Sequence, residues 1–108
     1  MATGLLIELN YKASHFVSRL DHPVHSNPHF HTWKVVLRIS GLLDAHDVQQ
    51  WMHGTAPHFG EHGDKGVEDI ADWWLAAAAS RWNEAGKGVR VLGLSVMRED
   101  GIGAYVET

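Results

Sequence analysis

The sequence of 108 residues contains no cysteine, which excludes several kinds of chemistry. Disulfides, thiolate metal ligands and a thiol nucleophile all need cysteine sulfur. The chain also lacks any apolar run near the roughly 20 residues that cross a membrane. Its first residues lack the charged segment and long apolar stretch of a signal peptide. We therefore expect a cytoplasmic protein with no membrane partner.

Basic residues are few and scattered along the chain. Nine Lys and Arg stand against thirteen Asp and Glu, so the net charge is −4 with neutral histidines. Nucleic-acid binding depends on clustered Lys and Arg that neutralise phosphates. We therefore expect no nucleic-acid partner, although a local basic pocket for an anionic small molecule remains open.

Two segments alternate between apolar and polar residues, as β-strands do. They run from Leu5 to Phe16 and from His29 to Ser40, and Asp21 to Pro28 between them reads as a loop. Near the end of the chain, Val89 to Arg98 and Ile102 to Val106 predict two more strands around an Asp-Gly turn. The length and the 44% apolar content fit one domain spanning residues 1–108.

Two helices are predicted between the strand pairs. The first runs from Asp44 to His53, and the glycine-rich stretch from His53 to Gly66 reads as a flexible loop. Asp64 is the expected cap of the second helix. Gly86 and Gly88 are expected to end that helix. Its apolar stripe has helical spacing. The stripe consists of Val67, Ile70, Ala71, Trp74, Leu75, Ala78, Ala79 and Trp82.

The predicted element order is β-β-α-α-β-β. We expect an α+β fold, with an antiparallel four-stranded sheet and both helices on one face. Such a sheet has two open edges, which must be paired or blunted. Trp73 lies off the apolar stripe of its helix. The open edges and an exposed Trp73 both favour self-association.

Histidine is unusually common, with nine copies, all within the first 62 residues. His29 and His31 are two apart and therefore share one face of a strand, and His15 ends the apolar face of the preceding strand. A hairpin would bring the three rings together. Three imidazoles suit zinc and leave a fourth position open, although nickel, iron and copper also bind imidazole. The alternative is that these are ordinary core or surface histidines.

Four motifs in order resemble the 6-pyruvoyl-tetrahydropterin synthase and 6-carboxy-tetrahydropterin synthase family. The segment Tyr11 to His15 resembles its F-x-A-x-H signature, and Pro28 to Val35 resembles its H-G-H-x-(Y/W)-x-V strand. The helix start Val67 to Ala71 resembles T-x-E-N-(L/I)-A. The segment Met97 to Glu99, followed by Ala104-Tyr105, resembles the closing v-x-E-T…a-x-Y segment.

The resemblance implies a single 6-pyruvoyl-tetrahydropterin-synthase-like domain with the tunnelling fold. In this fold, subunits join their sheets into a barrel, commonly a trimer stacked into a hexamer. It also implies zinc at His15, His29 and His31. Glu99 matches the carboxylate that anchors the pterin in this family, and it shares strand parity with Met97. The alternative is that Glu99 is an ordinary polar residue before a turn.

The chain departs from the family pattern at its acid–base residues. The family's base is a cysteine four residues before the first histidine of H-x-H, and that position is His25 here. A neutral imidazole is a competent base. The alternative is a loop histidine in a disabled site. No family Asp-His pair precedes the second helix, so His58 or His62 is the candidate proton relay.

These residues predict a zinc-dependent lyase or cyclase acting on a pterin-like or other polar small molecule. His25 would remove a proton next to a carbonyl that the metal polarises. Two alternatives remain open. The first is a non-catalytic, metal-stabilised binding or structural homologue. The second is metal-assisted hydrolysis.

Overall fold

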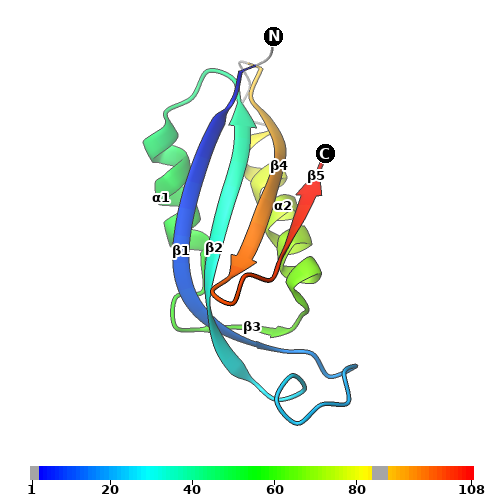
Figure 1. Cartoon of the computed structure of the whole chain (residues 1–108). Coiled ribbons are helices and arrows are strands. Elements are labelled where there is room, and N and C mark those ends of the chain that lie inside the picture. Colours follow the sequence, from blue (N-terminus) through cyan, green and yellow to red (C-terminus); the bar gives the residue numbers. More distant parts are fainter. Residues whose placement is uncertain (1–2, 84–87) are drawn as a thin grey trace.

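Two long antiparallel strands, β1 (Leu5–Phe16) and β2 (His29–Ser40), form the middle of the sheet (Figure 1). The computed structural model describes residues 3–83 and 88–108. Odd-numbered residues of both strands point toward the helices, and those from Ile7 to Ala13 and from Trp33 to Ile39 are buried. The period-two alternation of the two segments is therefore confirmed, and it sets which side chains enter the core.

The sheet has five strands and is mixed, so the predicted four-stranded antiparallel sheet of the tunnelling fold is wrong. Its strand order is β3-β1-β2-β4-β5, with β3 (Glu61–Asp64), β4 (Arg90–Arg98) and β5 (Gly103–Glu107). The pair β1–β3 is parallel and the other pairs are antiparallel. The element order is therefore β-β-α-β-α-β-β, although the α+β class holds.

The missed strand β3 lies in the stretch that the sequence predicted to be a flexible loop. Backbone hydrogen bonds define it. The Ser14 N–H donates to the Gly60 carbonyl at 2.9 Å, and the Lys65 N–H donates to the Phe16 carbonyl at 3.0 Å. A strand of four residues with one glycine carries no alternating apolar pattern, so side-chain periodicity could not reveal it.

Both helices cover the same face of the sheet, as predicted (Figure 1). The first, α1 (Ala45–Thr55), begins one residue later and ends two residues later than expected, and the Asp44 carboxylate accepts a hydrogen bond from the His46 N–H at 2.9 Å. The second, α2 (Val67–Trp82), buries Ile70, Trp74 and Ala78 along its predicted stripe, together with Val67, Ala71 and Trp82.

The ends of α2 differ in detail from the prediction. Its N-cap is Gly66, not Asp64, because the Asp64 carboxylate accepts hydrogen bonds from Ser18 instead. The Asp69 side chain accepts a hydrogen bond from the Gly66 N–H at 3.0 Å. The helix ends at Trp82, before Gly88. The other glycine predicted to end it, Gly86, lies outside the described residues.

Trp73 is half-buried, so it is not the exposed aromatic that the sequence indicated. Its ring lies edge-on to His62, with 5.5 Å between centroids, and also contacts Trp74. The sheet edges at β3 and β5 remain unpaired within the described chain. In the same residues, no helix is long and apolar enough to cross a membrane.

Candidate metal centre

The register of β1 and β2 brings His15, His29 and His31 to one point. His15 lies directly opposite His29, and Ala13 lies opposite His31. The ring centroid of His15 is 4.5 Å from that of His29 and 5.1 Å from that of His31. The His29 and His31 centroids are 4.9 Å apart. The predicted convergence of three imidazoles at one end of the sheet therefore occurs.

These three histidines form a group that could hold a metal ion. One ring nitrogen from each lies within 4.8 Å of the others. Imidazole nitrogens around a tetrahedral zinc ion, each about 2.0–2.1 Å from it, are separated by about 3.3 Å. The rings therefore need to approach one another by no more than roughly 1.5 Å, a shift that side-chain rotations can supply.

Each of the three rings is oriented by a hydrogen bond at Nδ1. The acceptors are the Lys65 carbonyl for His15 at 2.7 Å, the Asn27 carbonyl for His29 at 2.8 Å, and the Glu99 carboxylate for His31 at 3.0 Å. A carbonyl oxygen can only accept, so Nδ1 of His15 and His29 carries the proton. A neutral ring with a proton on Nδ1 has its lone pair on Nε2, where a metal binds.

Two of these Nε2 atoms are buried without a hydrogen-bond partner. They belong to His15 and His31. An unpaired polar atom in the protein interior costs about 1–3 kcal/mol, so proteins rarely leave one. A metal ion between the rings would satisfy both atoms. This observation argues against the alternative that these are ordinary core histidines with satisfied nitrogens.

The surroundings keep the site apolar on one side. The Trp33 ring lies edge-on beneath His15 and His31, with centroid distances of 5.0 and 5.3 Å. Its indole N–H donates to the Ala13 carbonyl at 3.0 Å, which fixes the ring. Burial lowers the pKa of His15, so its imidazole is neutral near pH 7. A neutral ring is the form that coordinates a metal.

A cavity of about 190 Å³ opens beside the three histidines. His25, the predicted base, also lines it. The His25 carbonyl accepts a hydrogen bond from the Val17 N–H at 2.7 Å, which holds the loop against β1. Desolvation and the neighbouring His22 lower the pKa of His25. A neutral imidazole is therefore available in the cavity. The cavity is lined by His15, Val17, Leu20, His25, His29, Arg98 and Ile102.

Glu99 reaches the metal centre through His31 and does not line this cavity. Its carboxylate accepts the His31 Nδ1–H, the arrangement of an outer-shell ligand. Desolvation, the largest single influence, raises the pKa of Glu99, but the hydrogen bond from His31, a backbone hydrogen bond and the charge of His31 together lower it below its ordinary value. The predicted role of Glu99 as a substrate anchor is not tested by this contact and stays a prediction.

The two predicted relay histidines lie away from the cavity lining. His58 is exposed, and its Nε2 donates to the His53 carbonyl at 2.7 Å. His62 is buried, and its Nε2 lies 2.6 Å from the Tyr11 hydroxyl. The structure does not bring either side chain to His25 within the described contacts, so the relay assignment stays a prediction.

Several functional groups could not be found from the sequence. The carbonyls of Lys65 and Asn27 orient the rings of His15 and His29, and backbone oxygens leave no sequence signal. Arg98 lines the cavity, and its proximity to Glu99 in the sequence was its only signal. A larger cavity of about 460 Å³ lies between β1 and α1, lined by Glu8, Gln49 and His53 among others. It is remote from the three converging histidines.

No family model matches the chain, and no curated protein matches its sequence. The resemblance to 6-pyruvoyl-tetrahydropterin synthase therefore stays a prediction that depends on the four motifs alone.

Proposed function

We propose that this protein is a zinc-dependent enzyme of the lyase or cyclase type that acts on a polar small molecule. The observation that supports it best is the arrangement of His15, His29 and His31. Each donates from Nδ1 to an acceptor, one ring nitrogen of each lies within 4.8 Å of the others, and His15 and His29 line a cavity. Structural zinc sites use four protein ligands, whereas three ligands and an open position are typical of catalytic sites.

The metal would polarise a carbonyl or hydroxyl oxygen of a bound substrate. His25 supplies the acid–base chemistry in this proposal. It lines the same cavity as His15 and His29, and its ring centroid is 6.2 Å from that of His29. None of the described hydrogen bonds engages its ring nitrogens. Its lowered pKa keeps it able to accept a proton from carbon near pH 7.

Membership of the 6-pyruvoyl-tetrahydropterin synthase family is part of this proposal, and so is a substrate that is either pterin-like or another polar small molecule. The proposal also includes a cytoplasmic location and a homo-oligomer, a trimer or hexamer. The unpaired edges at β3 and β5 support self-association, because open strand edges readily pair with other chains.

A second candidate is a non-catalytic protein that binds zinc and a ligand. One specific observation favours it. His58 and His62 lie outside the cavity lining, so His25 is the single acid–base histidine there besides the proposed ligands. A reaction that needs a second proton-transfer group would lack one. This candidate predicts zinc and ligand binding with no turnover.

Hydrogen–deuterium exchange separates the two candidates without knowledge of the full reaction. A panel of small carbonyl compounds is incubated in heavy water with zinc-loaded or chelator-treated protein, and exchange next to the carbonyl is followed by NMR. The enzyme proposal predicts exchange that requires both zinc and His25. Exchange that persists in metal-free protein would reject this mechanism. Zinc binding without exchange of any compound would favour the non-catalytic protein.

A further inference from the structure

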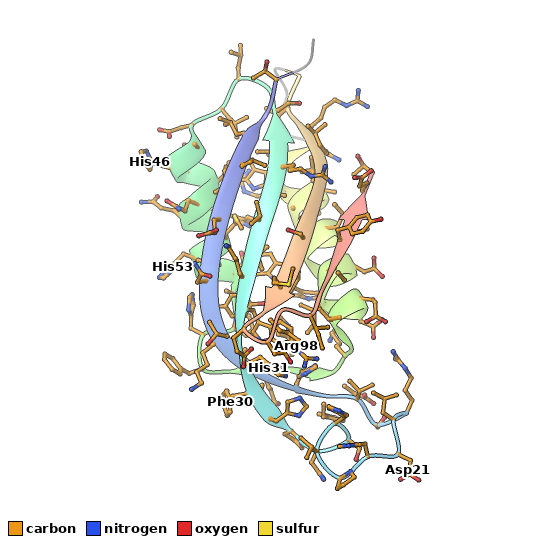
Figure 2. The ribbon with its side chains drawn as sticks, viewed as in Figure 1. Asp21, Phe30, His31, His46, His53 and Arg98 are labelled. Carbon is orange, nitrogen blue, oxygen red and sulfur yellow. The ribbon has the colours of Figure 1, made fainter. Side chains whose placement is uncertain are left out.

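Arg98 brings a positive charge to the cavity beside the metal centre. It is the last residue of β4, and its side chain is only 14% exposed. Figure 2 shows Arg98 and His31 at the same end of the sheet. The side chain lines the cavity together with His15, His25 and His29. No function described above uses this guanidinium group.

The turn after β4 holds the Arg98 side chain in place. Its Nε donates to the Asp100 carboxylate at 3.1 Å, and its Nη2 donates to the other oxygen of the same group. The Ile102 N–H also donates to Asp100, at 3.3 Å. Gly101 has a φ of 86°, a left-handed conformation that favours glycine. Asp100 engages two of the five N–H donors of Arg98, and the described contacts leave the others available.

The cavity has an excess of positive charge and no carboxylate in its lining. Apart from Arg98 it is lined by three histidines and by Val17, Leu20 and Ile102. A bound zinc ion would add two positive charges at the histidines. A guanidinium fork recognises carboxylates and phosphates through paired hydrogen bonds. The lining therefore favours an anionic ligand with a short apolar part against the aliphatic side chains.

The volume of the cavity limits the size of the ligand. At about 190 Å³ it is smaller than the roughly 300–1,000 Å³ of pockets for drug-sized ligands. A phosphate needs several donors for its three terminal oxygens, and Arg98 is the single Lys or Arg among the lining residues. A carboxylate has only two oxygens, and the guanidinium group of Arg98 alone can pair with both.

We propose that the substrate of this site is a small organic carboxylate, whose carboxylate group pairs with Arg98 in the cavity beside the metal centre. Asp100 acts as a positioning residue that holds the guanidinium group. The inference rests on the proposed metal centre and specifies its substrate class.

Calorimetric titration of the zinc-loaded protein tests this inference with three probes. They are lactate, its neutral analogue lactamide, and inorganic phosphate. We expect lactate to bind at least about 10-fold more tightly than lactamide, because a hydrogen bond to a charged group contributes roughly 10- to 100-fold in affinity. Phosphate should bind more weakly than lactate. Tighter binding of phosphate would overturn the carboxylate assignment.

Variants identify the group that recognises the anion. Arg98→Met should weaken lactate binding by about 10- to 100-fold and leave lactamide unchanged. Arg90→Met is the matched control, because Arg90 is exposed at the opposite end of β4. If Arg98→Met does not fold, Arg98→Lys carries the test. Lysine keeps the positive charge but lacks the paired N–H donors of the guanidinium group, so Arg98→Lys should weaken lactate binding and leave the zinc content unchanged.

Zinc content is measured first on the same samples. This measurement distinguishes a failure of the proposed metal centre from a failure of the proposed anion site. A protein without bound zinc would overturn the metal centre. A zinc-loaded protein that binds lactate and lactamide equally would overturn the anion site alone. The same conclusion would follow if the Arg98 variants bound lactate as tightly as the unaltered protein.

Discussion

Nδ1 of His31 lies 3.0 Å from both carboxylate oxygens of Glu99, and this contact joins the start of β2 to the turn after β4. The two residues are 68 positions apart in the sequence. Because Nδ1 of His31 donates its hydrogen bond to Glu99, Nε2 keeps its lone pair, and this atom is buried without a hydrogen-bond partner. In the proposed metal centre, Glu99 would therefore hold His31 in the form that can bind a metal.

Replacing Glu99 by Gln should weaken zinc binding. Loss of an outer-shell partner typically lowers metal affinity by about 10- to 100-fold. Competition with a chromophoric chelator measures the change. Glu107→Gln is the matched control, since Glu107 is an exposed glutamate paired with Arg38 at 3.1 Å. Unchanged zinc affinity in Glu99→Gln, with weaker binding of a pterin-like ligand, would favour the substrate-anchor role instead.

Replacing His25 by Gln should remove proton transfer and leave the metal in place. We expect carbon–hydrogen exchange to fall by about 100- to 10,000-fold, the usual contribution of a general base. Zinc content should stay the same, because His25 is not one of the three converging ligands. His22→Gln is the control, as His22 is an exposed neighbour whose ring centroid lies 4.2 Å from that of His25. Equal exchange in both variants would exclude His25 as the base.

The protein should lose stability between about pH 6.5 and pH 4 because of His62. Burial and the nearby Lys65 lower the pKa of His62 from 6.5 to about 4. As the pH falls, the unfolded chain therefore binds a proton before the folded one does. The stability from the neutral ring is fully present above pH 6.5 and is lost below pH 4. With about 1.4 kcal/mol for each unit of pKa, the loss is at most about 3.5 kcal/mol.

Urea unfolding of chelator-treated protein at pH 7.5 and pH 5 measures this loss, and His62→Gln should reduce it. His46→Gln provides the control, because the His46 side chain is 88% exposed. A pH dependence that is the same in both variants would show that other groups cause it.

The hydroxyl of Tyr11 should contribute measurably to stability. It accepts a hydrogen bond from the Trp74 indole N–H at 3.0 Å and pairs with His62 at 2.6 Å, in a buried network. Burial raises the pKa of Tyr11 above its ordinary value, so the group stays neutral. Tyr11→Phe leaves both partners unsatisfied and should cost about 1–3 kcal/mol of unfolding free energy. Tyr105→Phe, at a side chain that is 78% exposed, should change little.

The sequence predicted the convergence of the three histidines, because two simple rules determine where their rings lie. Residues two apart on a strand share a face, which placed His29 and His31 together, and the antiparallel pairing of the two strands placed His15 opposite His29. The stripe of α2 was predicted for the same kind of reason, since Ile70, Trp74 and Ala78 follow the helical period.

Backbone interactions account for most of what the sequence could not predict. The strand β3 forms through main-chain hydrogen bonds to the end of β1, with no side-chain pattern of its own. Asp64 does not cap α2 as predicted. Its carboxylate instead accepts hydrogen bonds from the backbone N–H and the hydroxyl of Ser18, which is far away in the sequence. Arg98 enters the cavity because Asp100 and the turn at Gly101 direct it there. Such contacts depend on the tertiary fold and not on local periodicity.

Zinc stoichiometry tests the central proposal most directly. Elemental analysis of the purified protein after zinc loading and dialysis should give about one zinc ion per chain, as expected for three imidazole ligands. His29→Ala should lose that zinc, and His53→Ala, a substitution on α1 away from the site (Figure 2), should retain it. A protein that binds no zinc, or a His29→Ala variant that binds it as tightly as the unaltered chain, would contradict the metal centre.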